Sequence, residues 1–255
     1  MREVPSMCQR VPHEGYKGPM KAVFKAKYVI RQSNVTVAVD RENLLTEALR
    51  SLLFHRLALD AYVKLHPEFK YSLQPVKVES HAPKVARLAA EAAEIAGVGP
   101  LAAVAGALAE AVMWDLVSAG AKLCVVENGG EISALSPGTM IIGVYAGPSP
   151  LSGKVGLELV KEDFPVGVAT SSASVSKAIN FGKADAAVAV ADEASIADAA
   201  AKAICNAVMG DDVEASVKRG LDVADDLRPY IRGALVVRGS YLGVTGRLPK
   251  VVRIS

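Results

Sequence analysis

Cysteine and aromatic side chains are scarce in this chain of 255 residues. It has 3 cysteines, none of them in a CxxC pair, and aromatic residues make up only 5% of the composition. Three cysteines far apart in sequence favour neither a disulfide framework nor a zinc site, and they fit a reducing cytosol. We therefore expect a cytoplasmic protein in which the cysteines serve as small apolar packing residues.

An excess of charge of either sign is also missing. The chain has 29 Lys and Arg against 27 Asp and Glu, and this balance gives no case for nucleic-acid binding. The longest charge-free run, between Glu131 and Lys154, is interrupted by prolines and glycines that a membrane-spanning helix would rarely tolerate together. Residues 1–20 carry charges and no apolar signal-peptide core. We expect no membrane partner, a flexible arm over residues 1–20 and a single domain over residues 21–255.

Apolar residues make up 51% of the chain, which is ample for a sizeable core. Short apolar runs bounded by Gly and Pro alternate with Ala-rich amphipathic segments. Asp40 and Asp192 are placed to cap helices at their N-termini, and Gly97 is placed to end one. The order of elements predicts an α+β fold with antiparallel sheets packed against long helices. Helices are expected over residues 41–65, 83–96, 100–119, 193–208 and 211–223, and strands over residues 21–30, 35–39, 122–126, 132–135, 139–145, 155–160, 166–170, 185–191, 233–238, 241–245 and 251–254.

A glycine pair follows one of the expected strands. Gly129 and Gly130 lie within Glu127–Ile132, where glycine lets the backbone turn sharply and come close to a ligand. The dipeptide of Asn128 and Gly129 is also a strong hairpin signal, and spacing alone favours that interpretation. A ligand site at this turn would include Asn128 and Glu131.

Hydroxyl side chains follow another expected strand. The segment Ala169–Ser174 contains Thr170, Ser171 and Ser172. Hydroxyls and free backbone amides after a strand can hold an anion such as phosphate. Serine and threonine equally cap turns, and the sequence leaves both roles open.

Two Ala-rich helices carry polar or small residues in unusual places. Asp198 and Lys202 are one turn apart on an otherwise apolar helix, where they form either a solvated ion pair or part of a site. Gly106 lies in mid-helix, four residues before Glu110, at a cost of about 1 kcal/mol against Ala. It indicates close packing or the approach of a ligand.

Taken together, these features resemble the ApbE-like superfamily, the family of FAD:protein FMN transferases also called thiamine-biosynthesis lipoproteins. The superfamily's short motifs correspond to Ala105–Glu110, Gly129–Ile132, Ala169–Ser171 and Ala197–Ala203. The sequence is still more similar to an uncharacterised ApbE-like family of archaea and bacteria. That second resemblance covers most of the chain from about residue 22 onward. It depends on His66–Phe69, Ala96–Pro100, Ala102–Gly106, Glu127–Gly130 and Phe181–Asp185.

Departures from the superfamily's motifs bear on function. In the transferases that the chain resembles, a helix Asp and a Thr one turn later hold Mg²⁺ beside the FAD pyrophosphate. Here Asp198 remains, but Lys202 replaces the Thr, and Ala105 replaces the motif lysine. A family segment with histidine, aspartate and threonine is missing, because Phe181–Lys183 leads directly into the next strand. These differences argue against flavin transfer and against FAD and Mg²⁺ as cofactors.

The sequence therefore predicts a cytosolic ApbE-like protein that binds a small anionic molecule, such as a nucleotide or phosphate, with Lys202 as the cation. Two alternatives stay open, a flavin transferase with an altered metal site and a non-catalytic scaffold subunit. The resemblance further implies an accessory role in assimilating sulfide into homocysteine, and base rates favour a homo-oligomer such as a dimer. No catalytic residue can be assigned. The expected ligand-binding residues are Gly106, Glu110, Asn128, Gly129, Gly130, Glu131, Thr170, Ser171, Ser172, Asp198 and Lys202.

Overall fold

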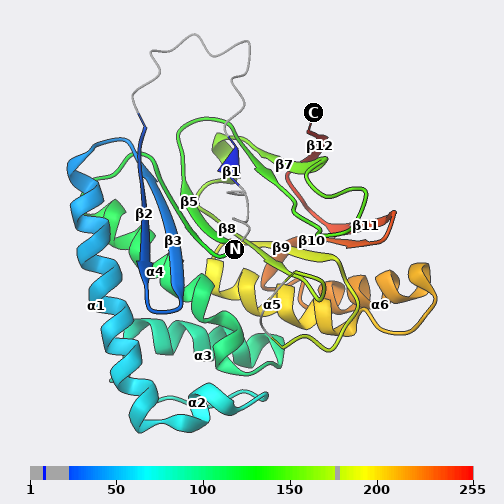
Figure 1. The fold of residues 1–255 in the computed structure, drawn as a ribbon, viewed down its shortest axis with the longest axis horizontal. Coiled ribbons are helices and arrows are strands. Elements are labelled where there is room, and N and C mark those ends of the chain that lie inside the picture. Colours follow the sequence, from blue (N-terminus) through cyan, green and yellow to red (C-terminus); the bar gives the residue numbers. More distant parts are fainter. Residues whose placement is uncertain (1–7, 10–22, 176–178, 255) are drawn as a thin grey trace.

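The computed structural model describes residues 8–9, 23–175 and 179–254, and it contains two antiparallel sheets (Figure 1). The larger sheet has eight strands in the order β11-β10-β9-β8-β5-β4-β3-β2. Its strands are β2 (Phe24–Ile30), β3 (Ser33–Val39), β4 (Cys124–Asn128), β5 (Glu131–Leu135), β8 (Val166–Ser171), β9 (Ala186–Ala191), β10 (Ile231–Arg238) and β11 (Tyr241–Gly246). The smaller sheet has the order β1-β6-β7-β12, formed by β1 (Cys8–Gln9), β6 (Met140–Gly143), β7 (Val155–Leu159) and β12 (Lys250–Arg253).

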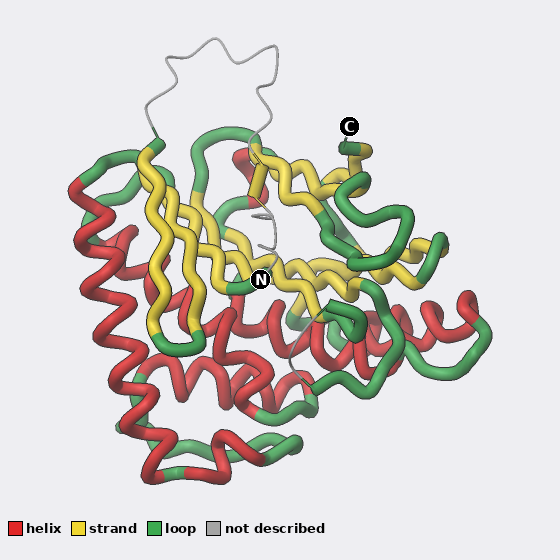
Figure 2. Tube along the Cα trace, viewed as in Figure 1, coloured by secondary structure: helices red, strands yellow, loops and turns green. Residues whose placement is uncertain are grey.

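The helices lie together on one side of the larger sheet, and the smaller sheet lies on its other side (Figure 2). One core forms where α1, α3 and α4 cover β3 and β4, and a second forms where α5 and α6 cover β8 to β10. A third core fills the space between the two sheets. The helices are α1 (Asn43–Leu65), α2 (Pro67–Tyr71), α3 (Lys84–Ala96), α4 (Val104–Ser118), α5 (Ala194–Ala207) and α6 (Val213–Asp226), with a 3-10 turn at Pro100–Ala103 before α4.

Strand β9 explains part of the small-residue composition. All six of its residues, in the sequence AAVAVA, are buried because both faces of the sheet are covered. Ala187, Ala189 and Ala191 pack toward α5, whereas Val188 and Val190 pack toward the smaller sheet. The face with only alanine lets the helix come close to the strand.

Glycines in the neighbouring elements allow α5 to pack closely against them. A Cβ atom at Gly106 of α4 would lie 2.2 Å from the backbone oxygen of Ala194, and one at Gly167 of β8 would lie 2.4 Å from the Ala194 nitrogen. At the other end of α5, a Cβ atom at Gly182 would lie 1.7 Å from the Cys205 oxygen. No larger residue fits these three places without a shift of the backbone, so glycine sets how closely α5 is seated.

One edge of the larger sheet is strand β2. Its side chains alternate between partly buried and exposed, with Ala26 and Tyr28 turned toward the protein and Lys25, Lys27 and Val29 exposed. This is the period of two expected for a strand covered on one face.

The α+β class predicted from the sequence is confirmed, and the predicted helices and strands lie within a few residues of their expected limits, whereas the short helix α2 was not predicted. Gly97 ends α3 with a φ of 65°, as predicted. The two predicted aspartate caps are wrong. The Asp40 carboxylate accepts a hydrogen bond from the Lys122 nitrogen at 3.3 Å, and Asp192 forms an ion pair with Arg232 at 2.6 Å. Long-range partners have replaced the local capping role of both side chains.

The predicted N-terminal arm over residues 1–20 lies outside the described residues except at Cys8 and Gln9. These two residues form β1, which pairs with Ile141 and Ile142 of β6. The sequence patterns did not predict a strand there.

One described segment, Pro100–Ser118, is long and apolar enough to cross a membrane, with a mean hydropathy of 1.5. In the fold, 61% of this segment is buried inside the protein. Helix α4 contacts α1, α3, α5 and the sheet, so packing inside the core accounts for its apolar composition.

We predict that Gly106→Ala destabilises the protein, although the same change in an exposed helix stabilises it by about 1 kcal/mol. The added Cβ would clash with the Ala194 oxygen, and we expect a loss of about 1–3 kcal/mol in the free energy of unfolding. Urea unfolding followed by circular dichroism measures it. Gly138→Ala is the control, since nothing lies within 4 Å of a Cβ atom there. A neutral or stabilising Gly106→Ala would contradict the close-packing role.

Candidate functional site

The glycine pair forms a hairpin turn between β4 and β5. Asn128 pairs directly with Glu131, and Gly129 and Gly130 have φ angles of 78° and 125°. Such positive φ angles favour glycine at both positions. The turn brings Glu131 to the end of β5, with its side chain partly buried.

Asp198 of α5 lies against α4. Its Oδ2 atom accepts a hydrogen bond of 2.8 Å from the Gly106 nitrogen, and Asn128 Nδ2 donates to the Ala105 oxygen at 3.2 Å. The start of α4 therefore bridges the end of β4 and the buried face of α5. Gly106 contributes a backbone donor to this arrangement, and its missing side chain lets the two helices meet.

Two acidic groups of this region have raised pKa values. Burial raises the pKa of Asp198 to about 7, although the Gly106 N–H and the charge of Lys202 both favour its ionised form. Burial, followed by the negative charge of Asp198, raises the pKa of Glu131 well above its usual value. Both carboxyl groups therefore hold a proton at a higher pH than an exposed carboxyl group would.

Lys202 lies one turn further along α5 and is also buried. Its Nζ donates to Asn180 Oδ1 at 2.7 Å and to the Ile179 oxygen at 3.3 Å, so both acceptors are neutral. Burial lowers the pKa of Lys202, whereas the nearby carboxyl groups of Asp198 and Glu131 raise it.

Asn180 connects Lys202 with the hydroxyl segment. Ser171 Oγ donates to Asn180 Oδ1 at 3.1 Å, and Asn180 Nδ2 donates to the Ser172 oxygen at 2.8 Å. The sequence reasoning missed Asn180, because nothing local marks a loop asparagine that contacts a lysine 22 residues away. Its place just before the family-like segment Phe181–Asp185 was the only available signal.

The structure thus brings together Asn128, Glu131, Ser171, Asp198 and Lys202 around the buried face of α5, and we call this group with Asn180 the α5 cluster. Ser172 Oγ accepts hydrogen bonds from the nitrogen atoms of Ser174 and Val175, so its hydroxyl closes its own turn. Thr170 is partly exposed in β8, opposite Val188.

Glu110 has a separate position at the first turn of α5. Its Oε2 atom accepts hydrogen bonds from the nitrogen and the hydroxyl of Ser195, at 3.0 Å and 2.7 Å. A buried carboxylate at a helix N-terminus satisfies backbone donors that lack partners within the helix. The contacts of Glu110 therefore stabilise the start of α5.

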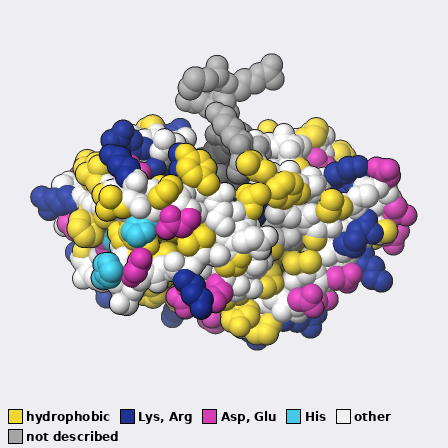
Figure 3. Space-filling model, turned by 90° about the horizontal axis from the view of Figure 1, so that it is seen from below, with side chains coloured by type: hydrophobic (Ala, Val, Ile, Leu, Met, Phe, Trp, Pro, Cys, Tyr) yellow, Lys and Arg dark blue, Asp and Glu magenta, His cyan; other side chains and the backbone are white. Residues whose placement is uncertain are grey.

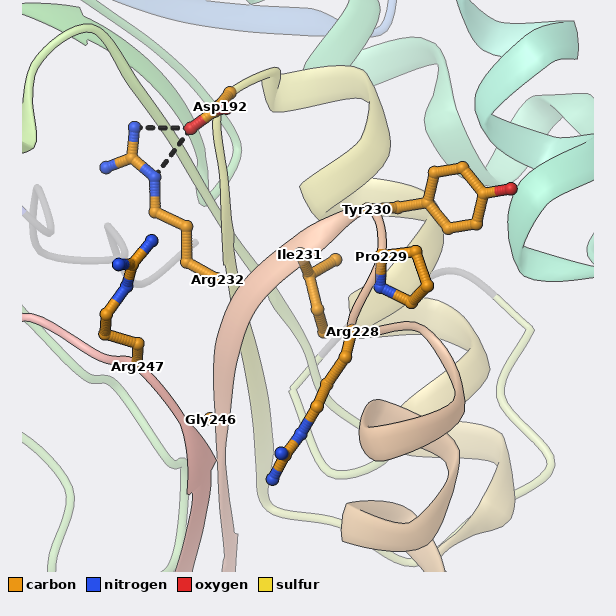
Figure 4. Close-up of a pocket in the computed structure, with 8 residues that line it drawn as sticks. All are labelled: Asp192, Arg228, Pro229, Tyr230, Ile231, Arg232, Gly246 and Arg247. Atoms are coloured by element: carbon orange, nitrogen blue, oxygen red, sulfur yellow. Dashed lines mark hydrogen bonds and ion pairs between the residues drawn. The ribbon is translucent and has the colours of Figure 1, made fainter.

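A surface hollow of about 350 Å³ lies elsewhere and contains none of the expected site residues (Figure 4). Within it, Arg232 is paired with Asp192 and also donates to the backbone oxygens of Asp163 and Pro165. Arg228 points away from this pair in Figure 4. Arg232 thus joins β10 to two loops, which is a structural role. The hollow is lined by Asp192, Arg228, Pro229, Tyr230, Ile231, Arg232, Gly246 and Arg247.

Comparison with known proteins identifies the family. A family model described as AbpE bacteria matches residues 19–230. The chain belongs to this ApbE-like family. Among relatives of the ApbE-like chain, a UPF0280 protein of Methanocaldococcus jannaschii is 42% identical over 232 residues, covering 90% of this chain and 93% of the relative. A UPF0280 protein of Methanopyrus kandleri is 40% identical over 234 residues, covering 91% and 94%.

Solved structures share the fold of the ApbE-like chain. The ApbE protein of Thermotoga maritima superposes with a TM-score of 0.56 at 13% identity, covering 89% of this chain and 97% of that one. The flavinyl transferase ApbE of Pseudomonas stutzeri gives a TM-score of 0.53 at 13% identity, covering 89% and 94%. At this level of identity the similarity concerns the fold alone, and it confirms the architecture predicted from the motifs.

We predict that Asp198→Asn flattens the dependence of stability on pH. An acid with a higher pKa in the folded chain than in the unfolded chain binds its proton more tightly when folded. Asp198 should therefore destabilise the protein progressively as the pH rises from about 4 to about 7, and asparagine cannot ionise. We expect the wild-type melting temperature to fall across this window by several degrees more than that of the variant, at about 2–4 °C per kcal/mol.

Thermal melts at a series of pH values measure the effect. Asp222→Asn, on the exposed side of α6, is the control and should follow the wild type. Identical pH profiles for the wild type and Asp198→Asn would show that this carboxyl group does not titrate in the window.

Proposed function

We propose that this ApbE-like protein binds a small anionic molecule, such as phosphate or a nucleotide, at Lys202 in the α5 cluster, and that it does not transfer flavin. The observation that carries the proposal is the buried amine of Lys202, which has neutral hydrogen-bond acceptors. A protonated lysine has three N–H donors, and Asn180 and Ile179 accept two of them. Among the residues that the structure describes, no third acceptor contacts this amine, which leaves one donor for a ligand.

A ligand would reach the amine of Lys202 past neighbouring side chains that are partly exposed. Lys202 itself is 9% exposed, whereas Asn180 and Glu131 are both partly exposed. An anion that displaced water at these two side chains would reach the lysine from the surface. The hydroxyl of Ser171, which already contacts Asn180, would be available close by.

The acidic neighbours make this binding dependent on pH. Ionised Asp198 and Glu131 would repel an anion, but burial raises both pKa values, to about 7 for Asp198. Below that pH Asp198 is mostly neutral, and burial also favours the neutral form of Glu131, so that Lys202 contributes a positive charge to the cluster. The electrostatic term therefore favours anion binding at mildly acidic pH.

The resemblance to flavin transferases implies Mg²⁺ as well as FAD, and the described side chains do not fit Mg²⁺. The amine of Lys202 interacts electrostatically with both Asp198 and Glu131, so its charge would oppose a divalent cation there. Within residues 8–9, 23–175 and 179–254, no three His, Cys, Asp or Glu side chains gather closely enough to hold a metal ion. This supports a ligand held by lysine rather than by metal.

We predict that sulfate, an anion of phosphate-like shape whose charge does not change between pH 6 and pH 8, binds the wild-type protein more tightly at pH 6 than at pH 8. Protonation of Asp198 removes a negative charge beside the anion, and we expect a gain of about tenfold or more in affinity, since about 1.4 kcal/mol corresponds to tenfold. Isothermal titration calorimetry at both pH values measures it. A thermal shift with sulfate provides a second readout, because a ligand of the native state raises stability.

Lys202→Met keeps the length of the side chain without its charge and should abolish binding. Lys218→Met, on the exposed face of α6, is the matched control and should bind as the wild type does. Binding that survives Lys202→Met would place the anion elsewhere and overturn the proposed site.

Incubation with FAD, Mg²⁺ and a threonine-containing target peptide addresses the alternative activity. Covalent FMN on the peptide, detected by mass spectrometry, would overturn the proposal in favour of a transferase. The absence of any thermal shift with phosphate, AMP or FAD would instead favour a non-catalytic scaffold. Cytoplasmic location and an accessory role in sulfide assimilation stay predictions.

A further inference from the structure

The family-like segment Phe181–Asp185 lies against the second half of α5. The Phe181 nitrogen donates to Asn206 Oδ1 of the helix at 3.0 Å. A Cβ atom at Gly182 would lie 1.7 Å from the Cys205 oxygen, so only glycine allows the chain to come this close. These two contacts hold the beginning of the segment directly on the helix.

Asn180 comes immediately before this segment, and its side-chain amide has a fixed orientation. Its Oδ1 atom accepts hydrogen bonds from the Lys202 amine at 2.7 Å and from the Ser171 hydroxyl at 3.1 Å. Its Nδ2 atom donates to the Ser172 oxygen at 2.8 Å. The reverse orientation would turn the amide NH2 group toward the amine and the amide oxygen toward a carbonyl, and both hydrogen bonds would be lost. The amide oxygen of Asn180 is therefore directed at Lys202.

The absence of charge on Asn180 matters for Lys202. An amide oxygen at 2.7 Å fixes the position of the amine without neutralising it. A carboxylate of the same shape would form a charge-assisted ion pair with the amine instead. Burial favours the neutral form of the two nearby carboxyl groups, those of Asp198 and Glu131. The residue at position 180 therefore decides whether the charge of Lys202 is available to a ligand.

The charges on the molecular surface give no general preference for anions. In Figure 3, Lys and Arg side chains are interspersed with Asp and Glu side chains, and those of the described residues do not form one broad basic patch. Lys183, three residues after Asn180, is paired with Asp211 at 2.8 Å. A broad basic surface would attract anions from solution, whereas a mixed surface does not. Preference for an anion therefore has to come from contacts within the α5 cluster.

We propose that Asn180 is the positioning residue that makes the charge of Lys202 available to an anion. Its amide oxygen holds the amine in place, and its lack of charge leaves the charge of the lysine to the ligand. The hydroxyl of Ser171 shares the same oxygen and can rotate toward an anion as a second donor. This inference rests on the proposed function, because it names the residue that prepares Lys202 for the ligand.

Asn180→Asp tests the proposal, because it adds a charge at this position and keeps the shape of the side chain. We expect the affinity for sulfate at pH 6 to fall about tenfold or more, since a carboxylate beside the ammonium group stays ionised and competes with the anion. Isothermal titration calorimetry measures the affinity. Asn34→Asp, at an exposed position of β3, is the matched control and should bind sulfate as the wild type does. An Asn180→Asp variant that binds sulfate as tightly as the wild type would overturn the proposal.

The protonation of Lys202 provides a second readout that needs no bound anion. In protein made with isotope-labelled lysine, carbon NMR follows each amine through a pH titration, and the signal missing from Lys202→Met identifies Lys202. We expect Asn180→Asp to raise the pKa of Lys202 above the wild-type value, because a carboxylate stabilises the charged amine. A residue that served packing alone would leave this pKa unchanged, and that result would overturn the role of Asn180.

The two measurements separate a failure of this inference from a failure of the proposed function. A wild type that binds no sulfate would overturn the proposed function, and the part of Asn180 in anion binding with it, even if the pKa of Lys202 rises in Asn180→Asp. A wild type that binds sulfate, together with an Asn180→Asp variant that changes neither the affinity nor the pKa of Lys202, would overturn this inference alone.

Discussion

The close seating of α5 is the constraint on which the rest of the structure depends. Near its first residue, Ala194, the helix packs between α4 and β8. Each of these neighbours has a glycine at the contact, Gly106 in α4 and Gly167 in β8. Near its last turn the same helix meets a third glycine in the loop before β9. The alanine face of β9 and the alanines of α5 belong to the same arrangement, because small side chains on both elements allow the short separation.

The α5 cluster is a consequence of this seating. Only because α4 approaches so closely can the Gly106 nitrogen reach the Asp198 carboxylate at 2.8 Å. The same approach excludes water from Asp198 and Lys202, and loss of water is the main cause of both pKa shifts. Close packing and unusual acid–base properties therefore have one physical origin.

Much of the fold follows from local patterns, whereas the site depends on contacts that no local pattern contains. Apolar runs bounded by Gly and Pro predicted the strands, and Gly97 marked the end of α3. The aspartates at 40 and 192 fit a capping pattern, but distant partners bind them more favourably. The order of strands in the larger sheet could not be predicted from the sequence either. Strand β8 pairs with β5, although β6 and β7 lie between them in the chain and belong to the other sheet. For the same reason the glycine turn, Asp198 and Lys202 could be recognised as motifs, while the contact between Asn180 and Lys202 could not.

The lysines on the exposed face of β2 have a consequence for association between molecules. Among the described residues this strand ends the larger sheet, and the backbone groups of an edge strand can recruit a strand from another molecule. Two such strands side by side would bring Lys25 and Lys27 of both molecules together, and the repulsion would disfavour a continuous intermolecular sheet. The charge pattern of an edge strand thereby protects the chain against main-chain aggregation and leaves side-chain surfaces to determine how copies meet.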